Sequence, residues 1–169
     1  MERYCFDETT KEILKHLRTP LAVYQFLNKR VVTVLVSDGF CELYGIGDRE
    51  RVIWLMDNDM YKSTHPDDKA RVADEAVRFA AEGGDYDVVY RTQLSGGGEY
   101  RIIHATGKHV CAEGGVQLAY IWYIDEGPWN KEGTDQQLAL GRSLRMTLTE
   151  QNACRITQYD TLTGLPTMP

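Results

Sequence analysis

Two close pairs of carboxylates are the residues whose spacing could support acid–base chemistry. Asp67 and Asp68 follow Pro66. Because proline suits the first position of a helix and acidic side chains suit its positive end, we assign this pair to a helix start. Asp57 and Asp59 have the spacing of a calcium-binding loop, but the segment lacks the central glycine and the downstream glutamate of such loops. We expect this second pair to lie in a solvated loop.

Cysteine, histidine and glycine give no stronger chemical signal. The four cysteines are Cys5, Cys41, Cys111 and Cys154, with neither a Cys-x-x-Cys pair nor a histidine at zinc-finger spacing. The run Gly96–Gly98 is predicted to be a hairpin turn rather than a phosphate-binding loop, because no helix begins after it. The local pattern brings together no serine, histidine and aspartate, and no cysteine and histidine. We therefore expect no catalytic residues, no metal site and no enzymatic activity in this chain.

The composition is that of a soluble globular protein, with 43% hydrophobic and 26% charged residues among 169. The net charge of −6 argues against a nucleic-acid or anionic-membrane partner, because phosphate binding needs concentrated lysine and arginine. The sequence opens without an apolar signal segment. No stretch approaches the run of about 20 apolar residues that crosses a bilayer. We expect a cytoplasmic location, with the cysteines reduced.

Hydrophobic periodicity and turn residues predict the elements that must position these side chains. In chain order they are an amphipathic helix over 9–17 begun by threonine, antiparallel strands over 21–27 and 31–36, a short helix over 37–46, one or two irregular helices over 48–61, a longer helix over 65–82, and strands over 86–92, 100–110 and 116–125. Ser37 or Asp38 can cap the short helix and Gly45 can end it. The last strand is apolar on both faces, so we expect it to be central in the sheet.

The order of these elements resembles the PAS fold. Three segments are similar to motifs of that family: Asp38–Gly45, His65–Asp68, and Tyr120–Glu126 at the end of the last strand, where Glu126–Gly127 departs from the usual Asp-Ile-Thr. The resemblance covers residues 17–126. It implies an α+β fold, with a five-stranded antiparallel sheet that carries short helices on one face and is flanked by an N-terminal helix and a C-terminal signalling helix.

The same resemblance implies a ligand pocket between the inner face of the sheet and the helices around 38–80. Strand parity and helical phase could put twelve residues there, namely Val34, Val36, Phe40, Leu43, Tyr44, Trp54, Tyr61, Val88, Tyr90, His104, Tyr120 and Trp122. A mostly apolar cleft with tyrosine hydroxyls and one histidine would suit a small organic molecule. The alternative is that these side chains close the core and bind nothing.

The histidines have plainer roles than cofactor binding. His65 could ligate haem, as one histidine does in some PAS domains, but helix entry within His-Pro-Asp-Asp is the simpler interpretation. His104 could line the pocket, although a hydrogen-bonded histidine in the sheet fits the pattern better. His16 and His109 are interpreted as exposed.

Flavin chemistry also finds little support. The light-sensing PAS branch uses a cysteine in an Asn-Cys-Arg-Phe-Leu-Gln motif, and nothing in this sequence resembles it. We assign Cys41 to the core. A flavin held without a covalent bond stays open, because Trp54, Trp122 and several tyrosines could stack on its ring. The cofactor is therefore left unassigned.

The last residues resemble the start of a second family. Asp160–Pro166 reads Asp-Thr-Leu-Thr-Gly-Leu-Pro, which is similar to the Asp-x-Leu-Thr-Gly-Leu-x-Asn-Arg phrase at the start of GGDEF domains. That family makes cyclic di-GMP from two GTP molecules. Thr167–Pro169 replaces the Asn-Arg step, and the Gly-Gly-Asp/Glu-Glu-Phe signature is not in the sequence. Upstream, Leu140, Leu144 and Leu148 lie four apart in a helix-prone stretch over 132–158, a poorly specified coiled coil.

Together these resemblances imply a bacterial sensory PAS domain that controls a covalently linked diguanylate cyclase through a dimeric helical linker. The expected divisions are an N-terminal helical cap at 1–20, the PAS domain at 21–126, the signalling helix at 127–159, and the start of a truncated GGDEF domain at 160–169. The expected partners are a second copy of the chain and the GGDEF domain, with a phosphodiesterase domain as a further possibility. The alternative is a ligand-free PAS dimerisation scaffold.

Overall fold

The computed structural model describes residues 2–94, 98–129, 159–160 and 165–166. Contacts divide the chain into two units, Met1–Trp129 and Asn130–Pro169. In the second unit, strand β6 (Tyr159–Asp160) pairs with β7 (Leu165–Pro166) in antiparallel fashion. The expected signalling helix with Leu140, Leu144 and Leu148, and most of the expected turn at Gly96–Gly98, lie outside the described residues.

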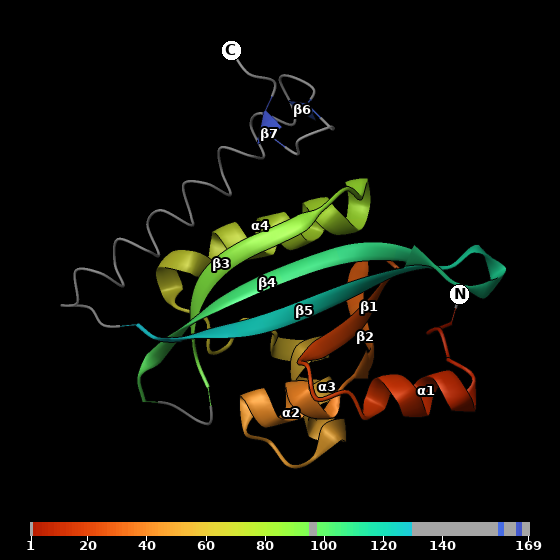
Figure 1. Ribbon diagram of the computed structural model, residues 1–169, viewed down its shortest axis with the longest axis horizontal. Coiled ribbons are helices and arrows are strands. Elements are labelled where there is room, and N and C mark those ends of the chain that lie inside the picture. Colours follow the sequence, from red (N-terminus) through yellow and green to blue (C-terminus); the bar gives the residue numbers. More distant parts are fainter. Residues whose placement is uncertain (1, 95–97, 130–158, 161–164, 167–169) are drawn as a thin grey trace. The chain divides into compact units, whose positions relative to one another are not determined.

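The first unit is built on a five-stranded antiparallel sheet with the strand order β2-β1-β5-β4-β3 (Figure 1). β5 is the central strand, as its two apolar faces predict. The elements in chain order are α1 (Glu8–Lys15), β1 (Leu21–Leu27), β2 (Arg30–Val36), α2 (Asp38–Tyr44), α3 (Arg49–Asp59), α4 (Pro66–Glu82), β3 (Tyr86–Gln93), β4 (Tyr100–Cys111), the 3-10 turn η1 (Glu113–Gly115) and β5 (Gln117–Pro128). The predicted α+β fold is confirmed.

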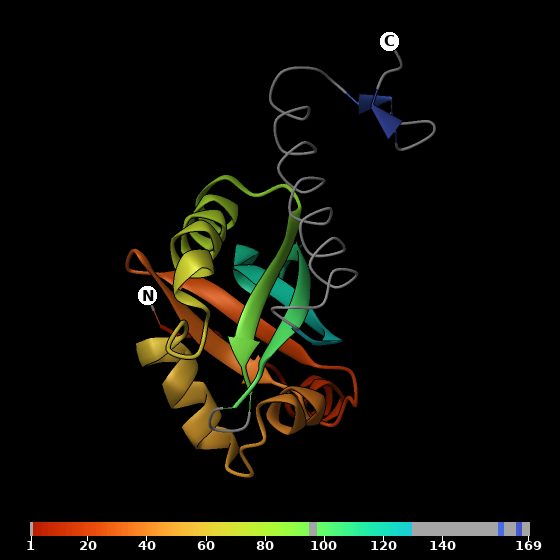
Figure 2. The same cartoon turned by 90° about the vertical axis from the view of Figure 1, so that its left-hand side faces the viewer.

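Each face of the sheet has its own apolar core. Helices α2, α3 and α4 cover the inner face, where Phe40, Val52 and Val72 pack on the strands. On the inner face, α3 and α4 (yellow) lie together to the left of the strands in Figure 2. The outer face is covered by Leu14 of α1 and by residues before that helix. There Tyr4 and Phe6 pack against a smaller cluster that includes Leu21, Val23, Leu35 and Leu118.

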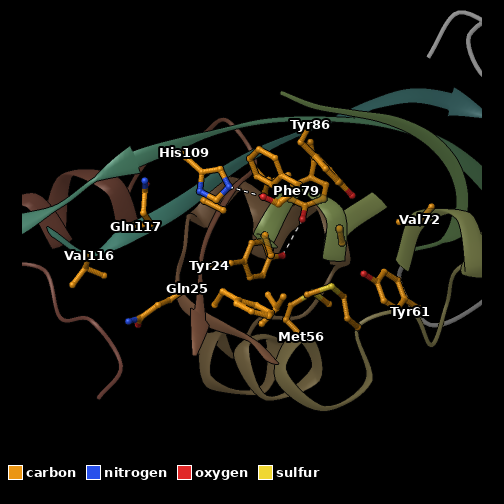
Figure 3. Close-up of a pocket in the computed structure, with 18 of the residues that line it drawn as sticks. Tyr24, Gln25, Met56, Tyr61, Val72, Phe79, Tyr86, His109, Val116 and Gln117 are labelled. Atoms are coloured by element: carbon orange, nitrogen blue, oxygen red, sulfur yellow. Dashed lines mark hydrogen bonds between the residues drawn. The ribbon is translucent and has the colours of Figure 1, made fainter. Parts of the chain in front are cut away.

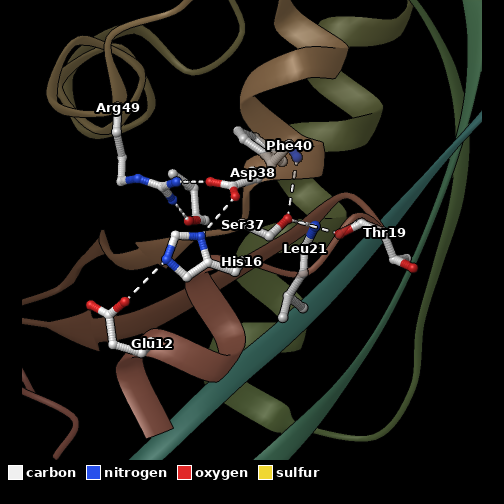
Figure 4. Close-up of polar contacts among 9 residues, drawn as sticks. Glu12, His16, Thr19, Leu21, Ser37, Asp38, Phe40 and Arg49 are labelled. Atoms are coloured by element: carbon white, nitrogen blue, oxygen red, sulfur yellow. Dashed lines mark hydrogen bonds and ion pairs between the residues drawn. The ribbon is translucent and has the colours of Figure 1, made fainter. Parts of the chain in front are cut away.

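The hydroxyl of Ser37 joins the start of α2 to the start of β1. It caps α2 by accepting a hydrogen bond from the Phe40 N–H at 3.2 Å. It also accepts from the Leu21 N–H at 2.9 Å and donates to the Thr19 carbonyl at 2.8 Å (Figure 4). Gly45 ends the helix with a φ of 68°, a left-handed conformation that suits glycine. Both predicted ends of this helix are confirmed.

Two other helices differ from their predictions. α1 starts after Asp7, whose carboxylate accepts a hydrogen bond from the Thr10 N–H at 2.9 Å, so aspartate and not threonine caps it. α3 is one continuous helix of 11 residues rather than one or two irregular helices. Its last turns include Asp57 and Asp59, so this pair does not lie in a solvated loop. Asp57 accepts a hydrogen bond from the Thr33 N–H at 2.7 Å and therefore ties α3 to β2.

A β-bulge changes which residues of β2 face the helices. Val23 pairs with Leu35, but the next residue of β1, Tyr24, pairs with Thr33, so Val34 is the extra residue. Side chains alternate along a strand, and one extra residue shifts the alternation by one. Val36 consequently packs in the inner core, whereas Val34 packs in the outer cluster.

A buried ion pair holds α4 to the edge of the sheet. The side chain of Asp68 is 4% exposed and accepts hydrogen bonds from Arg91 at Nε (2.9 Å), at a terminal guanidinium nitrogen (2.8 Å) and at the backbone N–H (2.9 Å). The His65 N–H donates to the Arg91 carbonyl at 2.8 Å. Both acidic residues stand at a helix start, as predicted, but Asp68 is a buried structural carboxylate as well.

Burial raises the pKa of Asp68, but the hydrogen bonds and the charge of Arg91 outweigh burial and hold that pKa below its ordinary value of 3.8. A group whose pKa is lowered by folding stabilises the protein above its unfolded-state pKa. That stabilisation is lost as the pH falls through the folded-state pKa. The ion pair therefore contributes fully at neutral pH.

We expect Asp68→Asn to lower the free energy of unfolding by about 3 kcal/mol at neutral pH, because it leaves the Arg91 guanidinium without its carboxylate. Urea unfolding measures the change. Asp67→Asn is the matched control, since the Asp67 side chain in the same helical turn is 78% exposed. Similar losses in the two variants would contradict this role for the ion pair.

Candidate ligand-binding cavity

A cavity of 360 Å³ lies between the inner face of the sheet and helices α3 and α4 (Figure 3). Tyrosines dominate its polar lining: Tyr24, Tyr44, Tyr61, Tyr86, Tyr90 and Tyr123. The remaining wall is mostly apolar and includes Met56, Val72 and Phe79. Such a cavity, largely apolar with a few polar groups, is typical of small-molecule sites.

Strand alternation and helical spacing explain why these residues converge. On β5, the alternate residues Ala119, Ile121 and Tyr123 all line the cavity. On α4, a set of residues at spacings of three and four does the same: Val72, Ala76, Phe79 and Ala80. Both periodicities are visible in the sequence, but only the fold brings the two sets together.

One pair of tyrosines forms a hydrogen bond inside the cavity. The Tyr24 hydroxyl from β1 lies 2.9 Å from the Tyr123 hydroxyl from β5. The two side chains belong to residues that are 5% and 8% exposed. Burial raises the pKa of both hydroxyls well above the ordinary value of 10, and it raises the pKa of Tyr44 and of Tyr61 to about 12. All four are therefore neutral phenols at physiological pH.

His109 on β4 also lines the cavity, although the sequence predicts an exposed side chain. Its Nε2–H donates to the Phe79 carbonyl at 2.8 Å, and its ring lies 4.2 Å from the Phe79 ring. Its Nδ1 is buried and has no hydrogen-bond partner among the described residues. The exposed prediction is wrong because His109 shares the strand parity of Ile103 and Ala105, both buried in the inner core.

The described lining contains neither an acidic residue nor a lysine or arginine. The described part of the chain also holds no group of three or more histidine, cysteine or acidic side chains that could bind a metal ion. Apart from His109, whose Nε2–H already donates to the Phe79 carbonyl, the described lining offers a charged molecule no partner of opposite charge, and burying such a charge in an apolar site is costly. The arrangement therefore suits a neutral organic molecule.

Three of the twelve predicted pocket residues line the cavity, namely Tyr44, Tyr61 and Tyr90. Four others lie on the predicted side of the sheet but pack in the inner core without reaching the cavity: Val36, Phe40, Leu43 and Val88. Trp54 is 58% exposed on α3. Helical phase alone did not place it correctly, because α3 is longer and more regular than predicted.

The remaining predicted residues lie on the outer side of the sheet. Val34, Tyr120 and Trp122 pack around the outer cluster beneath the N-terminal residues. For Tyr120 and Trp122 the predicted alternation is right but the assigned face is wrong, since both faces of β5 are apolar. Neither tryptophan proposed to stack on a flavin lines the cavity.

His104 is a hydrogen-bonded histidine in the sheet rather than a cavity residue. Its Nε2 lies 2.6 Å from a carboxylate oxygen of Asp87, and its Nδ1 lies 3.4 Å from one of Glu126. The hydrogen bond to Asp87 is the main cause that raises the pKa of His104 above 6.5; partial burial opposes it, and the charges of Asp87 and Glu126 add to it.

His65 caps α4 and does not line the cavity. Its Nδ1 accepts a hydrogen bond from the Asp67 N–H at 3.1 Å. Its ring packs against Tyr100 and Trp129, with ring centres 4.8 and 5.6 Å away. The helix-entry interpretation accounts for these contacts. Cys41 is partly buried against the inner core, as predicted, and also lies outside the cavity lining.

The family pattern described as the PAS fold matches residues 33–124, more than half of the chain. Similar solved structures include the PAS domain of a protein from Colwellia psychrerythraea (TM-score 0.52, 16% identity, 71% of this chain and 96% of that chain). A Rhodobacter sphaeroides LOV protein is also similar (TM-score 0.57, 15% identity, 79% and 74%). So is the PAS domain of a two-component sensor histidine kinase (TM-score 0.50, 13% identity, 70% and 95%).

At these identities the solved structures support the fold alone. No curated protein matches the sequence. Within the described ranges, no helix is long and apolar enough to cross a membrane.

We expect His104 to give the wild type a pH-dependent part of its stability. Because its pKa is raised by folding, its contribution is complete below the unfolded-state pKa and is lost as the pH rises through the folded-state pKa. Urea unfolding between pH about 6 and about 9 should therefore show a steeper decline in the wild type than in His104→Gln, which keeps only the contribution of His16, whose pKa is raised by its hydrogen bonds to Asp38 and Glu12. Parallel pH profiles for the two proteins would show that the contacts to Asp87 and Glu126 do not stabilise the charged ring.

Proposed function

Because the chain belongs to the PAS fold family, we propose that it senses a small organic molecule in its cavity and regulates a linked diguanylate cyclase. The observation that carries the sensing role is the 360 Å³ cavity beneath α4, lined by tyrosines and apolar side chains and bare of charge among its described residues. PAS domains are sensory modules of signal-transduction proteins such as the histidine kinase to which this chain is similar. In this proposal the chain itself is regulatory and not catalytic.

The proposed output rests on the sequence around Asp160–Pro166, which resembles the start of a GGDEF domain. GGDEF catalysis brings two GTP-loaded domains face to face, so the sensor acts as a homodimer. The leucine stripe at 140, 144 and 148 supports a helical linker whose arrangement differs between two states. A ligand shifts such an equilibrium by its difference in affinity for the two states. Since the output consumes GTP, we place the protein in the cytoplasm.

Deleting residues 1–126 from the longer protein tests the regulatory role. We expect the rate of cyclic di-GMP synthesis from GTP to change, because the deletion removes the sensor and leaves the linker. An unchanged rate would refute the proposal that this domain controls the cyclase.

A ligand-free dimerisation scaffold is the second candidate. It is favoured by two exposed apolar side chains, Ile13 on α1 and Ile124 on β5. In this alternative the N-terminal helix and the outer face of the sheet pair two copies of the chain, and no ligand enters the cavity. A melting temperature that stays constant across a screen of neutral metabolites would favour the scaffold.

We expect Ala76→Phe to abolish the thermal stabilisation given by any metabolite that binds the cavity. Ala76 lies on α4 in the cavity wall, so the larger side chain occupies ligand volume. A ligand present at 100 times its dissociation constant stabilises the folded state by about 2.7 kcal/mol, which a melting curve detects easily.

Val77→Phe on the same helix is the control, because Val77 is exposed and does not line the cavity. Equal stabilisation of both variants by the same metabolite would place its binding site elsewhere on the protein.

A further inference from the structure

We propose that the ligand is a neutral molecule with a carbonyl oxygen or ring nitrogen, and that this acceptor takes the unused proton of the Tyr24–Tyr123 hydroxyl pair. The inference rests on the proposed function, because it assumes that the cavity binds a small organic molecule. It adds the chemistry by which that molecule is recognised.

The hydroxyl pair carries one proton more than its single hydrogen bond uses. Each tyrosine hydroxyl carries one proton, and the contact of 2.9 Å between the two oxygens uses only one of them. The described residues offer neither hydroxyl a second hydrogen bond. One O–H donor is therefore left over, whichever tyrosine donates to the other.

The unused donor lies in the wall of the cavity, where a bound ligand can reach it. Tyr24 and Tyr123 come from the neighbouring strands β1 and β5, where Tyr24 pairs with Ala119, four residues from Tyr123, and both tyrosines line the cavity. Figure 3 shows the hydroxyl of Tyr24 bonded within the group of cavity side chains. Both residues are more than nine-tenths buried. A buried donor without an acceptor is unfavourable, so a ligand that supplies an acceptor gains affinity from this pair.

The charge of the lining excludes ions as preferred ligands. None of the described lining residues is a lysine or an arginine, and the Nε2–H of His109 already donates to the Phe79 carbonyl, so a carboxylate would enter without a permanent cation to pair with. Since burial raises the pKa of both hydroxyls, the pair is uncharged and offers no phenolate to attract a cation. A neutral acceptor such as a ketone, an ester, an amide or a pyridine-type nitrogen meets both conditions.

Three probes of similar shape separate these requirements. Acetophenone carries a carbonyl, α-methylstyrene replaces that oxygen with a methylene group, and benzoate is the anion of similar size. Binding to the 169-residue protein is followed by ¹H–¹⁵N NMR titration. We expect benzoate to bind at least about a hundredfold more weakly than acetophenone, because its charge is buried without a partner.

The decisive quantity is the affinity ratio of acetophenone to α-methylstyrene, because it cancels effects common to both probes. Removing both hydroxyls in Tyr24→Phe/Tyr123→Phe should lower this ratio about tenfold. Either single variant should keep the ratio within about threefold of the wild type, since the remaining hydroxyl then has its own proton free. Tyr61→Phe, which removes a cavity hydroxyl outside the pair, should leave the ratio unchanged.

The outcomes separate this inference from the proposed function. If the ratio in the double variant equals that of the wild type while both probes still bind, the inference is wrong and ligand sensing stands. If benzoate binds as tightly as acetophenone, the neutral-ligand assignment is wrong. If no probe shifts the spectrum, the inference fails, and the metabolite screen with Ala76→Phe decides on sensing separately. Dispersed NMR spectra of all variants verify that they are folded.

Discussion

The buried ion pair between Asp68 and Arg91 holds the helical wall of the cavity against the sheet. Arg91 belongs to the edge strand β3, and its guanidinium also lies 4.8 Å from the centre of the Trp129 ring, just beyond the end of β5. His65, which caps α4, packs on the same tryptophan. The contacts of Arg91 with Asp68 and Trp129, together with that of His65 with Trp129, therefore join the start of α4, the sheet edge and the last residue of the first unit. Because a buried charge without its partner is costly, the start of α4 and the sheet edge cannot separate independently.

This arrangement matters for the proposed sensing role, because α4 is anchored to the sheet at its start and also forms part of the cavity wall. At its start, α4 is held through Asp68. Near its end, the Phe79 carbonyl accepts from His109, so the helix is tied to β3 at one end and to β4 at the other. A molecule that fills the cavity between these ties presses on a helix that has little freedom to move away. Its effect would reach the sheet strands directly.

Much of the fold could be predicted because its signals are local. Ser37 and Gly45 bound α2 through contacts within a few residues, and Pro66 opens α4 in the same way. The choice of sheet face was not predictable for β5, because alternation shows which side chains share a face and not which face the helices cover. A long-range fact decided it, namely the cover that Tyr4 and Phe6 provide over the other face. Tyr123 was missed for this reason, although it alternates regularly with Ala119 and Ile121. Tyr24 was missed because the first five residues of β1 are all buried and their pattern does not separate the two faces.

The N-terminal residues that pack on the outer face of the sheet also set the boundary of the smallest fragment that can be fused to another protein and still fold. The family pattern starts at residue 33, after β1 and after all of the N-terminal cover. A fragment cut there would lose the strand that pairs with β5 and would open the apolar cluster around Leu118 to water. The Arg3 guanidinium donates a hydrogen bond to the Thr33 carbonyl at 2.9 Å, so the chain is bound to the sheet from its first residues onward. A transplantable sensor module therefore has to begin ahead of Arg3 and run to Trp129.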